Sequence, residues 1–459
     1  MTETKSRGGQ LATNMTVGDP KKLIILFSIP LLIGNIFQQL YNMVDSVVVG
    51  NYVGKIALAA VGSCFPIIYL LSSIFIGIST GSTIMISQFY GAQNLKEVKE
   101  TVNTVYTSMM VGAIPLTLVG ILCSGWVLQL TQVPPDTFDA ARTYLVIIFV
   151  GLIGNLGYNV NTGIMQGLGD SKTPLIFLVI ACAINIVLDL VFVIVFHMGV
   201  AGVALATIIA QAASWLFGIV YINKKYPFLH IQPFKLSFHK ELFTQTMRLG
   251  IPSSIQSALF SVGVLAIQSL VNSGGSDFMA GFNGANKLDT FAFMPIDSFS
   301  RAVTTYVGQN IGAGKLDRVK SGTRAALGMS AVVAVALGAF VLATGRYMMM
   351  MFSQEPAVID AGVAYLNRIL PFYLILAALF VLNGVMRGAG ETLVPMFSSI
   401  ISLWLARVPA AYILNHFFGK ENIFYCYAIG WVFGVSISLY FYLKGDWKNK
   451  GITMASQRE

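Results

Sequence analysis

The sequence predicts an all-α integral membrane protein with twelve transmembrane helices in two six-helix lobes, related by a pseudo-two-fold axis along the membrane normal. Composition is the first observation behind this prediction, since 55% of the 459 residues are hydrophobic and only 11% are charged. Soluble domains average roughly 25% charged residues. A chain this poor in charge cannot cover a water-facing surface, which argues against a soluble enzyme, a nucleic-acid-binding protein or a disordered scaffold.

Twelve apolar stretches are the second observation, because about 20 apolar residues cross the hydrocarbon core as a helix. In the first half these stretches are residues 23–50, 56–89, 102–128, 141–166, 174–196 and 200–222. In the second half they are residues 249–271, 278–311, 321–351, 362–386, 392–416 and 423–443. The second and eighth stretches are long enough to tilt, bend or project beyond the membrane, and Pro66 and Pro295 are candidate bending points.

A repeat at a constant offset of 221 residues is the third observation. Residues 88–99 match 309–320, residues 135–145 match 356–366, and residues 165–174 match 386–395. Each repeat contains an even number of spans, so both enter the membrane in the same orientation and should face each other as two lobes. Such lobes can open a central cleft to either side in turn, which suits a transporter and which a channel would not require.

Basic residues gather in the loops on one side of the predicted membrane region. Most of the 29 Lys and Arg residues lie there, whereas the loops of the other side contain Lys55, Arg142, Arg346 and Lys420. Basic loops stay in the cytoplasm, which predicts cytoplasmic termini and a multi-pass protein of the plasma membrane. The asymmetry accounts for the net charge of +9 without a nucleic-acid partner, although basic loops can contact anionic lipids.

These boundaries divide the chain into five predicted segments. They are a cytoplasmic N-terminal segment at 1–22, an N-lobe at 23–222, a cytoplasmic inter-lobe loop at 223–248, a C-lobe at 249–443 and a cytoplasmic tail at 444–459.

Polar residues recur at helical spacing on four predicted helices of the N-lobe. They are Asn35, Gln38, Asn42 and Asp45 in the first span, Asn155, Asn159, Thr162 and Gln166 in the fourth, Asn185 and Asp189 in the fifth, and Thr207, Gln211 and Ser214 in the sixth. Polar side chains in hydrocarbon either bond helices to one another or line a pathway. Both interpretations stay open for the neutral residues.

Asp45 and Asp189 are the strongest functional candidates, because neither has a basic residue nearby on its own helix. A lone carboxylate in hydrocarbon costs at least a few kcal/mol, so each must be protonated, ion-bound or hydrated. Two adjacent buried carboxyl groups can hold a proton at physiological pH. Alternatively, Asn185 and Thr207 could supply neutral oxygens beside the two carboxylates and complete a Na⁺ site. A protonated pair with only a structural role is the remaining interpretation.

The C-lobe has a less regular set of polar residues. Asp297 and Arg301 are spaced i, i+4 and are expected to form an ion pair. Asp289 lies on another side of the same helix, and Arg407 in the eleventh span has no partner on its own helix. We therefore include both in a candidate substrate cavity, whose residues are Gln38, Asn42, Asn159, Thr162, Gln211, Gln256, Asp289 and Arg407.

The motifs of this chain resemble those of multidrug and toxic compound extrusion (MATE) transporters over nearly its whole length. The resemblance rests on Gln88-Phe-Tyr-Gly91-Ala92 and Val307-Gly-Gln-Asn-Ile-Gly-Ala-Gly314, on Met165-Gln-Gly-Leu-Gly-Asp170 and its repeat Met386-Arg-Gly-Ala-Gly-Glu391, and on Asn185-Ile-Val-Leu-Asp189. It implies a secondary antiporter, not an enzyme, that exports cationic or amphipathic compounds in exchange for inward H⁺ or Na⁺ and needs no other cofactor.

Carried over residue by residue, the resemblance implies an N-lobe site for the coupling ion. Its residues are Tyr41, Asp45, Asn185, Asp189 and Thr207, of which the last four could ligate Na⁺. One departure is Thr162, which stands where the family commonly has Asn, although Asn383 keeps that residue in the repeat. We expect the protein to work as a monomer among membrane lipids.

A flippase for a lipid-linked precursor, from the same superfamily, is the alternative function. A cationic cavity that binds head groups would favour it, with Lys287, Arg301 and Arg407 lining one cleft. An ATP-driven pump is disfavoured, because the glycine-rich segment at 308–314 lacks the Lys-Ser or Lys-Thr ending of a phosphate-binding loop.

Overall fold

In the computed structural model, residues 13–452 are described, and all the regular elements among them are helices. The first half contains α1 (Pro20–Val48), α2 (Lys55–Gly91), α3 (Leu95–Leu130), α4 (Pro135–Val150), α5 (Leu152–Gly167), α6 (Lys172–Leu190) and α7 (Gly199–Lys225). The second half contains α8 (Lys240–Asn272), α9 (Ser276–Gly312), α10 (Leu316–Met349), α11 (Pro356–Ile369), α12 (Tyr373–Gly388), α13 (Leu393–Ile400), α14 (Val408–Phe418) and α15 (Tyr425–Lys444). The predicted all-α class is confirmed.

Short irregular helices connect or extend some of these elements. π-helical segments lie at Val49–Val53, Val191–Val195 and Ile401–Arg407, and 3₁₀ segments lie at Leu370–Phe372, Lys420–Phe424 and Trp447–Asn449. The predicted N-terminal segment at 1–22 and tail at 444–459 fall partly outside the described residues.

The helices have the lengths and compositions of membrane spans. Among the described residues, ten continuous helical stretches are long and apolar enough to cross a membrane, and α4 with α5 forms an eleventh that is bent by 53°. The remaining long helix is α9, which matches α2 in length at 37 residues but contains charged side chains. The chain is therefore a multi-pass membrane protein whose helices follow the predicted six-plus-six pattern.

The bend between α4 and α5 was not predicted, since residues 141–166 were expected to form one span. Gly151 lies at the break, and a Cβ atom there would stand 2.2 Å from Cβ of Ile208 on α7. The absence of a side chain therefore lets α7 pass close to the bend.

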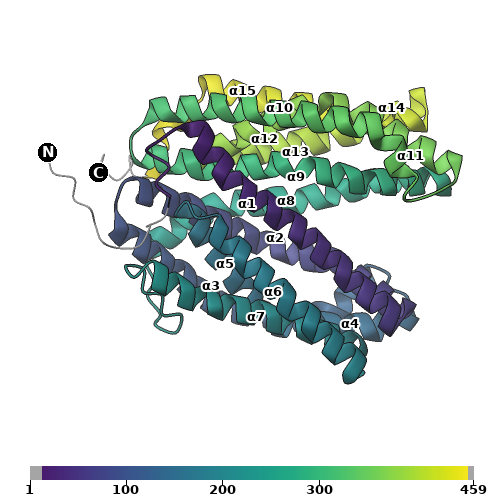
Figure 1. Cartoon of the computed structure of the whole chain (residues 1–459), viewed down its shortest axis with the longest axis horizontal. Coiled ribbons are helices and arrows are strands. Elements are labelled where there is room, and N and C mark those ends of the chain that lie inside the picture. The colour runs from purple at the N-terminus through teal and green to yellow at the C-terminus, as the bar shows by residue number, and fades with distance from the viewer. Residues whose placement is uncertain (1–12, 453–459) are drawn as a thin grey trace. The chain divides into compact units, whose positions relative to one another are not determined.

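The described chain forms two compact units. The first, called unit 1, consists mainly of Ile33–Arg248, and unit 2 contains Thr16–Leu32 and the residues from Leu249 onward. The division falls inside α1, whereas the sequence placed the start of the N-lobe at residue 23. In Figure 1 α9, α10, α12 and the yellow α15 of unit 2 run side by side.

The two units repeat the same internal packing. In unit 1, α2 packs on α5 and α5 on α7, and in unit 2, α9 packs on α12 and α12 on α15. Thr83 donates to the carbonyl of Gly163 at 2.9 Å, and Thr304 donates to the carbonyl of Gly384 at 3.1 Å. Thr304 and Gly384 are the counterparts of Thr83 and Gly163 at the 221-residue offset, so the repeat seen in the sequence is a repeated helix–helix contact.

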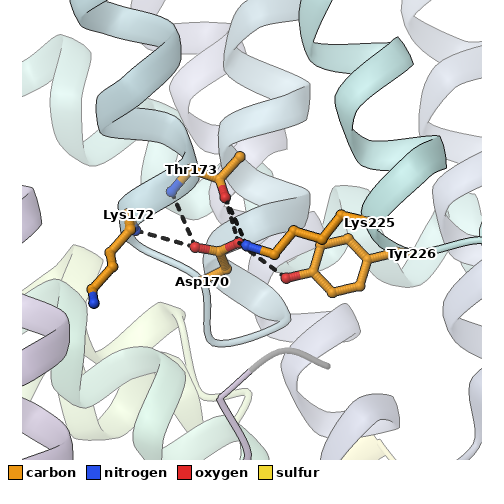
Figure 2. Close-up of polar contacts among 5 residues, drawn as sticks. All are labelled: Asp170, Lys172, Thr173, Lys225 and Tyr226. Atoms are coloured by element: carbon orange, nitrogen blue, oxygen red, sulfur yellow. Dashed lines mark hydrogen bonds and ion pairs between the residues drawn. The ribbon is translucent and has the colours of Figure 1, made fainter. Parts of the chain in front are cut away.

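The Met165–Asp170 motif forms a capped turn in front of α6. Asp170 accepts hydrogen bonds from the backbone N–H of Thr173 at 3.0 Å, from Nζ of Lys225 at 2.7 Å and from the hydroxyl of Tyr226 at 3.0 Å (Figure 2). Burial raises the pKa of Asp170, but the hydrogen bonds from Lys225 and Thr173 outweigh it and hold that pKa below its ordinary value. The motif thus ties the start of α6 to the end of α7.

Candidate functional site

The five residues that the resemblance assigns to ion coupling come together inside unit 1. Tyr41 and Asp45 come from α1, Asn185 and Asp189 from α6, and Thr207 from α7. Asp45 is 5% exposed and Asp189 is 1% exposed, and their carboxyl groups lie within hydrogen-bonding reach of each other. The i, i+4 spacing of Asn185 and Asp189 places both on one face of α6, which is why that pair could be found from the sequence.

Asn185 links the carboxyl pair to α7. In the amide orientation that satisfies both of its polar atoms, Nδ2 donates to Oδ2 of Asp189 at 3.0 Å and the oxygen accepts from the backbone N–H of Thr207 at 3.2 Å. The Thr207 hydroxyl donates to the carbonyl of Val203 at 3.0 Å and lies within hydrogen-bonding reach of the Tyr41 hydroxyl. The site is therefore one network across three helices.

The electrostatics of this network favour a bound cation or a shared proton. The charged group that acts on Asp189 is the carboxylate of Asp45. The Oδ1 atoms of both residues are buried and have no hydrogen-bond partner among the described residues. Two adjacent carboxylates without a counter-charge are unstable in a low-dielectric interior. The unpartnered oxygens lie near the oxygens of Asn185 and Thr207, so the network has acceptor atoms that could hold a proton or a small cation.

Tyr144 is a member of the site that the sequence did not identify. It lies on α4, is 4% exposed and interacts electrostatically with Asp45 and Asp189. Its repeat counterpart Tyr365 donates a hydrogen bond to Oδ2 of Asp289 at 3.0 Å in unit 2. The signal was present in the repeat, because this tyrosine recurs at the 221-residue offset.

The candidate cavity residues of unit 1 have varied surroundings. Asn159 bonds within its own helix, to the carbonyl of Asn155 at 2.9 Å and to its side chain at 3.1 Å. The Thr162 hydroxyl is buried and lies within hydrogen-bonding reach of the Tyr158 hydroxyl. Gln38 is exposed, and Asn42 and Gln211 are partly exposed. Asn159 and Thr162 therefore have partners on their own helix, whereas Gln38 is open to the surface.

Unit 2 contains a second polar centre, formed by Asp289 and Arg407. Asp289 on α9 accepts hydrogen bonds from the hydroxyls of Tyr365 and Tyr373. Arg407 is 6% exposed, and its guanidinium lies 4.5 Å from the ring centroid of Tyr427 and 5.9 Å from that of Trp431. Tyr365 and Tyr373 lie on α11 and α12, and Tyr427 and Trp431 both lie on α15. Because none of them shares a helix with Asp289 or Arg407, spacing along one helix did not reveal these contacts.

The other polar residues expected in the C-lobe have local partners. Asp297 and Arg301 form the predicted ion pair at 2.8 Å. Lys287 lies 5.8 Å from the ring centroid of Phe352, and Gln256 donates to the hydroxyl of Ser399 at 2.6 Å. Lys287, Arg301 and Arg407 thus have different nearest neighbours.

Known proteins resemble this chain over nearly its full length. A family model described as MatE matches residues 30–191 and again residues 252–413. The probable multidrug resistance protein YpnP of Bacillus subtilis is 32% identical and covers 95% of this chain and 98% of its own length. The probable multidrug resistance protein NorM of Thermotoga maritima is 28% identical, with 95% of each chain covered.

Solved structures share the fold of the chain. One, titled as MATE in the straight conformation, has a TM-score of 0.88 at 22% identity and covers 96% of this chain and 100% of its own. A second, also with a TM-score of 0.88 at 22% identity, covers 96% of this chain and 99% of its own. Its title describes a MOP superfamily transporter from Pyrococcus furiosus whose binding pocket has reverse polarity, which suggests a different function.

Proposed function

Since this chain belongs to the MatE family of membrane transporters, we propose that it exports cationic or amphipathic organic compounds in exchange for inward-moving H⁺ or Na⁺. Relatives named as multidrug resistance proteins support the efflux part of this proposal. Transport proceeds by alternating access of the two lobes. The protein works in the plasma membrane as a monomer, with both termini in the cytoplasm and no cofactor besides the coupling ion.

The observation that carries the proposal is the buried carboxyl pair of Asp45 and Asp189. When both groups are ionised, their repulsion pushes α1 and α6 apart. When a proton or Na⁺ binds, that repulsion disappears and the contact between the two helices is stabilised. The ion therefore has a different affinity for two arrangements of unit 1, which is what coupling to a conformational change requires.

The pair can serve either ion. A shared proton needs only the two carboxyl groups, whereas Na⁺ would draw on the neutral oxygens of Asn185 and Thr207 as well. These two residues lie beside the pair and connect α6 to α7. A Na⁺-coupled protein is therefore expected to be more sensitive to Asn185→Ala than a proton-coupled one.

A flippase for a lipid-linked precursor is the second candidate function. It is favoured by Arg407, a buried cation in a chain whose fold is shared by a transporter with a pocket of reverse polarity. It is disfavoured by Lys287 and Arg301, because the first lies over Phe352 and the second is paired with Asp297. Those cations do not join Arg407 in a head-group site.

The test is ethidium efflux from proteoliposomes that carry an imposed proton or sodium gradient. Asp45→Asn and Asp189→Asn should each lower gradient-driven transport at least about tenfold, and the gradient that drives the wild type identifies the ion. Asp277→Asn removes an exposed carboxylate at the start of α9 and is the matched control. Wild-type protein that transports under neither gradient would refute the antiporter and favour the flippase.

A further inference from the structure

We propose that unit 2 contains a binding site for zwitterionic compounds, in which Arg407 binds the ligand's carboxylate and Asp289 binds its cationic group. This inference deepens the proposed function by naming a substrate class. It rests on the geometry of the Asp289–Arg407 centre, whose residues belong to unit 2, whereas the carboxyl pair belongs to unit 1.

Arg407 is held in a position that leaves its charge unpaired. Its Nε atom is buried without a hydrogen-bond partner, and the guanidinium makes no ion pair within 4.0 Å among residues 13–452. Tyr427 and Trp431 contact the guanidinium through their rings. Aromatic stacking occupies the face of a guanidinium and leaves the N–H groups along its edge available for a carboxylate.

The backbone around Arg407 supports this placement. The residue ends the π-helical segment Ile401–Arg407, a kind of distortion that is frequent at functional sites. A Cβ atom on Gly430 would stand 3.0 Å from Cβ of Arg407 and 2.8 Å from the carbonyl oxygen of Ser402. Only glycine at this position lets α15 lie this close to the π-helical segment.

Asp289 supplies the opposite charge at a separate place. The hydroxyls of Tyr365 and Tyr373 each donate to one of its carboxylate oxygens, which fixes the group on α9. Its charge and that of Arg407 interact electrostatically, yet the two side chains form no ion pair within 4.0 Å in the described structure. Unit 2 therefore holds an acidic and a basic side chain in fixed positions that make no direct ion pair with each other in the described chain.

This arrangement selects a ligand with both charges. Charged groups in the membrane interior are costly, and a direct ion pair would reduce the cost. A ligand whose carboxylate meets Arg407 and whose cationic group meets Asp289 would satisfy both groups without adding net charge. At this site a simple cation would leave Arg407 without a counter-charge and a simple anion would leave Asp289 without one, so either is expected to bind more weakly here than a zwitterion. The aromatic side chains favour a ligand with an apolar portion.

The centre is also specific to unit 2. At the 221-residue offset, Asp289 corresponds to Ile68 and Arg407 to Ile186, while Tyr427 and Trp431 both correspond to alanine. The common helical framework of the two units therefore does not require these side chains. An alternative is that the two charges only balance each other through space and stabilise the fold.

Equilibrium binding of a matched pair of fluorescent probes separates these explanations. Nε-dansyl-lysine carries an amine and a carboxylate, and its methyl ester keeps the amine but lacks the carboxylate. Dansyl fluorescence is titrated with purified full-length protein in lipid nanodiscs. We expect the wild type to bind the free acid at least about tenfold more tightly than the ester, because only the free acid can accept charge-assisted hydrogen bonds from Arg407.

Each variant has a distinct expected result. Arg407→Gln should weaken binding of the free acid about tenfold or more and leave ester binding within about twofold, whereas Asp289→Asn should weaken both. Arg407→Lys keeps the charge without the planar donors and should give an intermediate loss for the free acid. Arg301→Gln, which breaks the pair with Asp297, is the matched control and should change neither affinity.

Two outcomes would overturn the inference. One is equal affinity of the wild type for the two probes, a result that does not depend on whether any variant folds. The other is an Arg407→Gln protein in which both affinities fall together, as expected for a purely structural role. Probe binding is read without any gradient, so a protein that binds the free acid selectively but transports nothing would refute the proposed antiport while supporting this site.

Discussion

The two units share one framework but place opposite chemistry in it. The polar centre of unit 1 is the carboxyl pair of Asp45 and Asp189, which forms no ion pair within the described chain, whereas the centre of unit 2 combines Asp289 with the stacked guanidinium of Arg407. A π-helical segment follows Asp189 in one unit and ends at Arg407 in the other. The repeated parts hold helices together, and the parts that differ are the ones that can bind an ion or a ligand.

A tyrosine is the polar element that both centres share. Tyr144 lies beside the carboxyl pair in unit 1, and Tyr365 donates to Asp289 in unit 2. The comparison teaches that a repeat preserves contacts between helices more strictly than it preserves charge.

The largest expected effect is the loss of transport when either carboxyl group of the Asp45–Asp189 pair is replaced. Asp45→Asn and Asp189→Asn should each lower the initial rate of gradient-driven efflux at least about tenfold, and the double variant should be no slower than either single variant. Residues that hold one ion together act non-additively. Initial rates in proteoliposomes test this, and losses that multiply in the double variant would mean that the two groups act independently.

The repeated glycine contacts should cost stability equally in both units. A Cβ atom at Gly163 would stand 2.5 Å from Oγ of Ser79, and one at Gly384 would stand 2.5 Å from the carbonyl oxygen of Ser300. Gly163→Ala and Gly384→Ala should each lower the free energy of unfolding by about 1–3 kcal/mol through overpacking, measured by chemical denaturation in micelles.

Matched controls exist in each unit. Gly62 and Gly328 lie in helices and have no neighbouring atom within 4 Å of an added Cβ. Gly62→Ala and Gly328→Ala should therefore be neutral or slightly stabilising. A loss confined to Gly163→Ala or to Gly384→Ala would show that the framework is not equivalent in the two units.

The difference between framework and centres also explains what the sequence could reveal. Hydropathy and the 221-residue repeat predicted the spans, because a helix must be apolar along most of its length to cross a bilayer. The i, i+4 pair Asn185 and Asp189 predicted part of the site in unit 1, because both residues share one helical face. The hydropathy and i, i+4 signals depend on residues within one helix, and the repeat depends only on a constant offset along the chain.

Other features depend on contacts between helices and gave no such signal. The surroundings of Arg407 include Tyr427 and Trp431 on α15, and aromatic residues are common in membrane spans. The bend at Gly151 involves a close approach of its backbone to Ile208 on α7, and a contact between two helices leaves no pattern within either one. The motif ending at Asp170 served to recognise the family, but its capping role needed the positions of Lys225 and Tyr226 at the end of α7.

The smallest expected effect is on the free energy of unfolding, when the capping carboxylate of either unit, Asp170 or Glu391, is replaced. Asp170 is bonded by the α6 N-terminus and by Lys225 and Tyr226 (Figure 2), whereas Glu391 accepts from the N–H groups of Leu393 and Val394 and from Lys450. Asp170→Asn should lower the free energy of unfolding by about 1 kcal/mol. Glu391→Gln should cost less, because Lys450 is half exposed.

The pKa of Asp170 determines how the stability difference between wild type and Asp170→Asn changes with pH. The pKa of Asp170 is lowered from 3.8 in the folded protein, so the unfolded chain takes up a proton at a higher pH than the folded one. The carboxylate therefore stabilises the fold fully at neutral pH, and its contribution declines as the pH falls below roughly 4. The difference in stability between wild type and Asp170→Asn should shrink over that range. A difference that stays constant from pH 7 down to pH 3 would mean that the Asn variant loses packing rather than charge, and the bonds to Lys225 would then not distinguish unit 1 from unit 2.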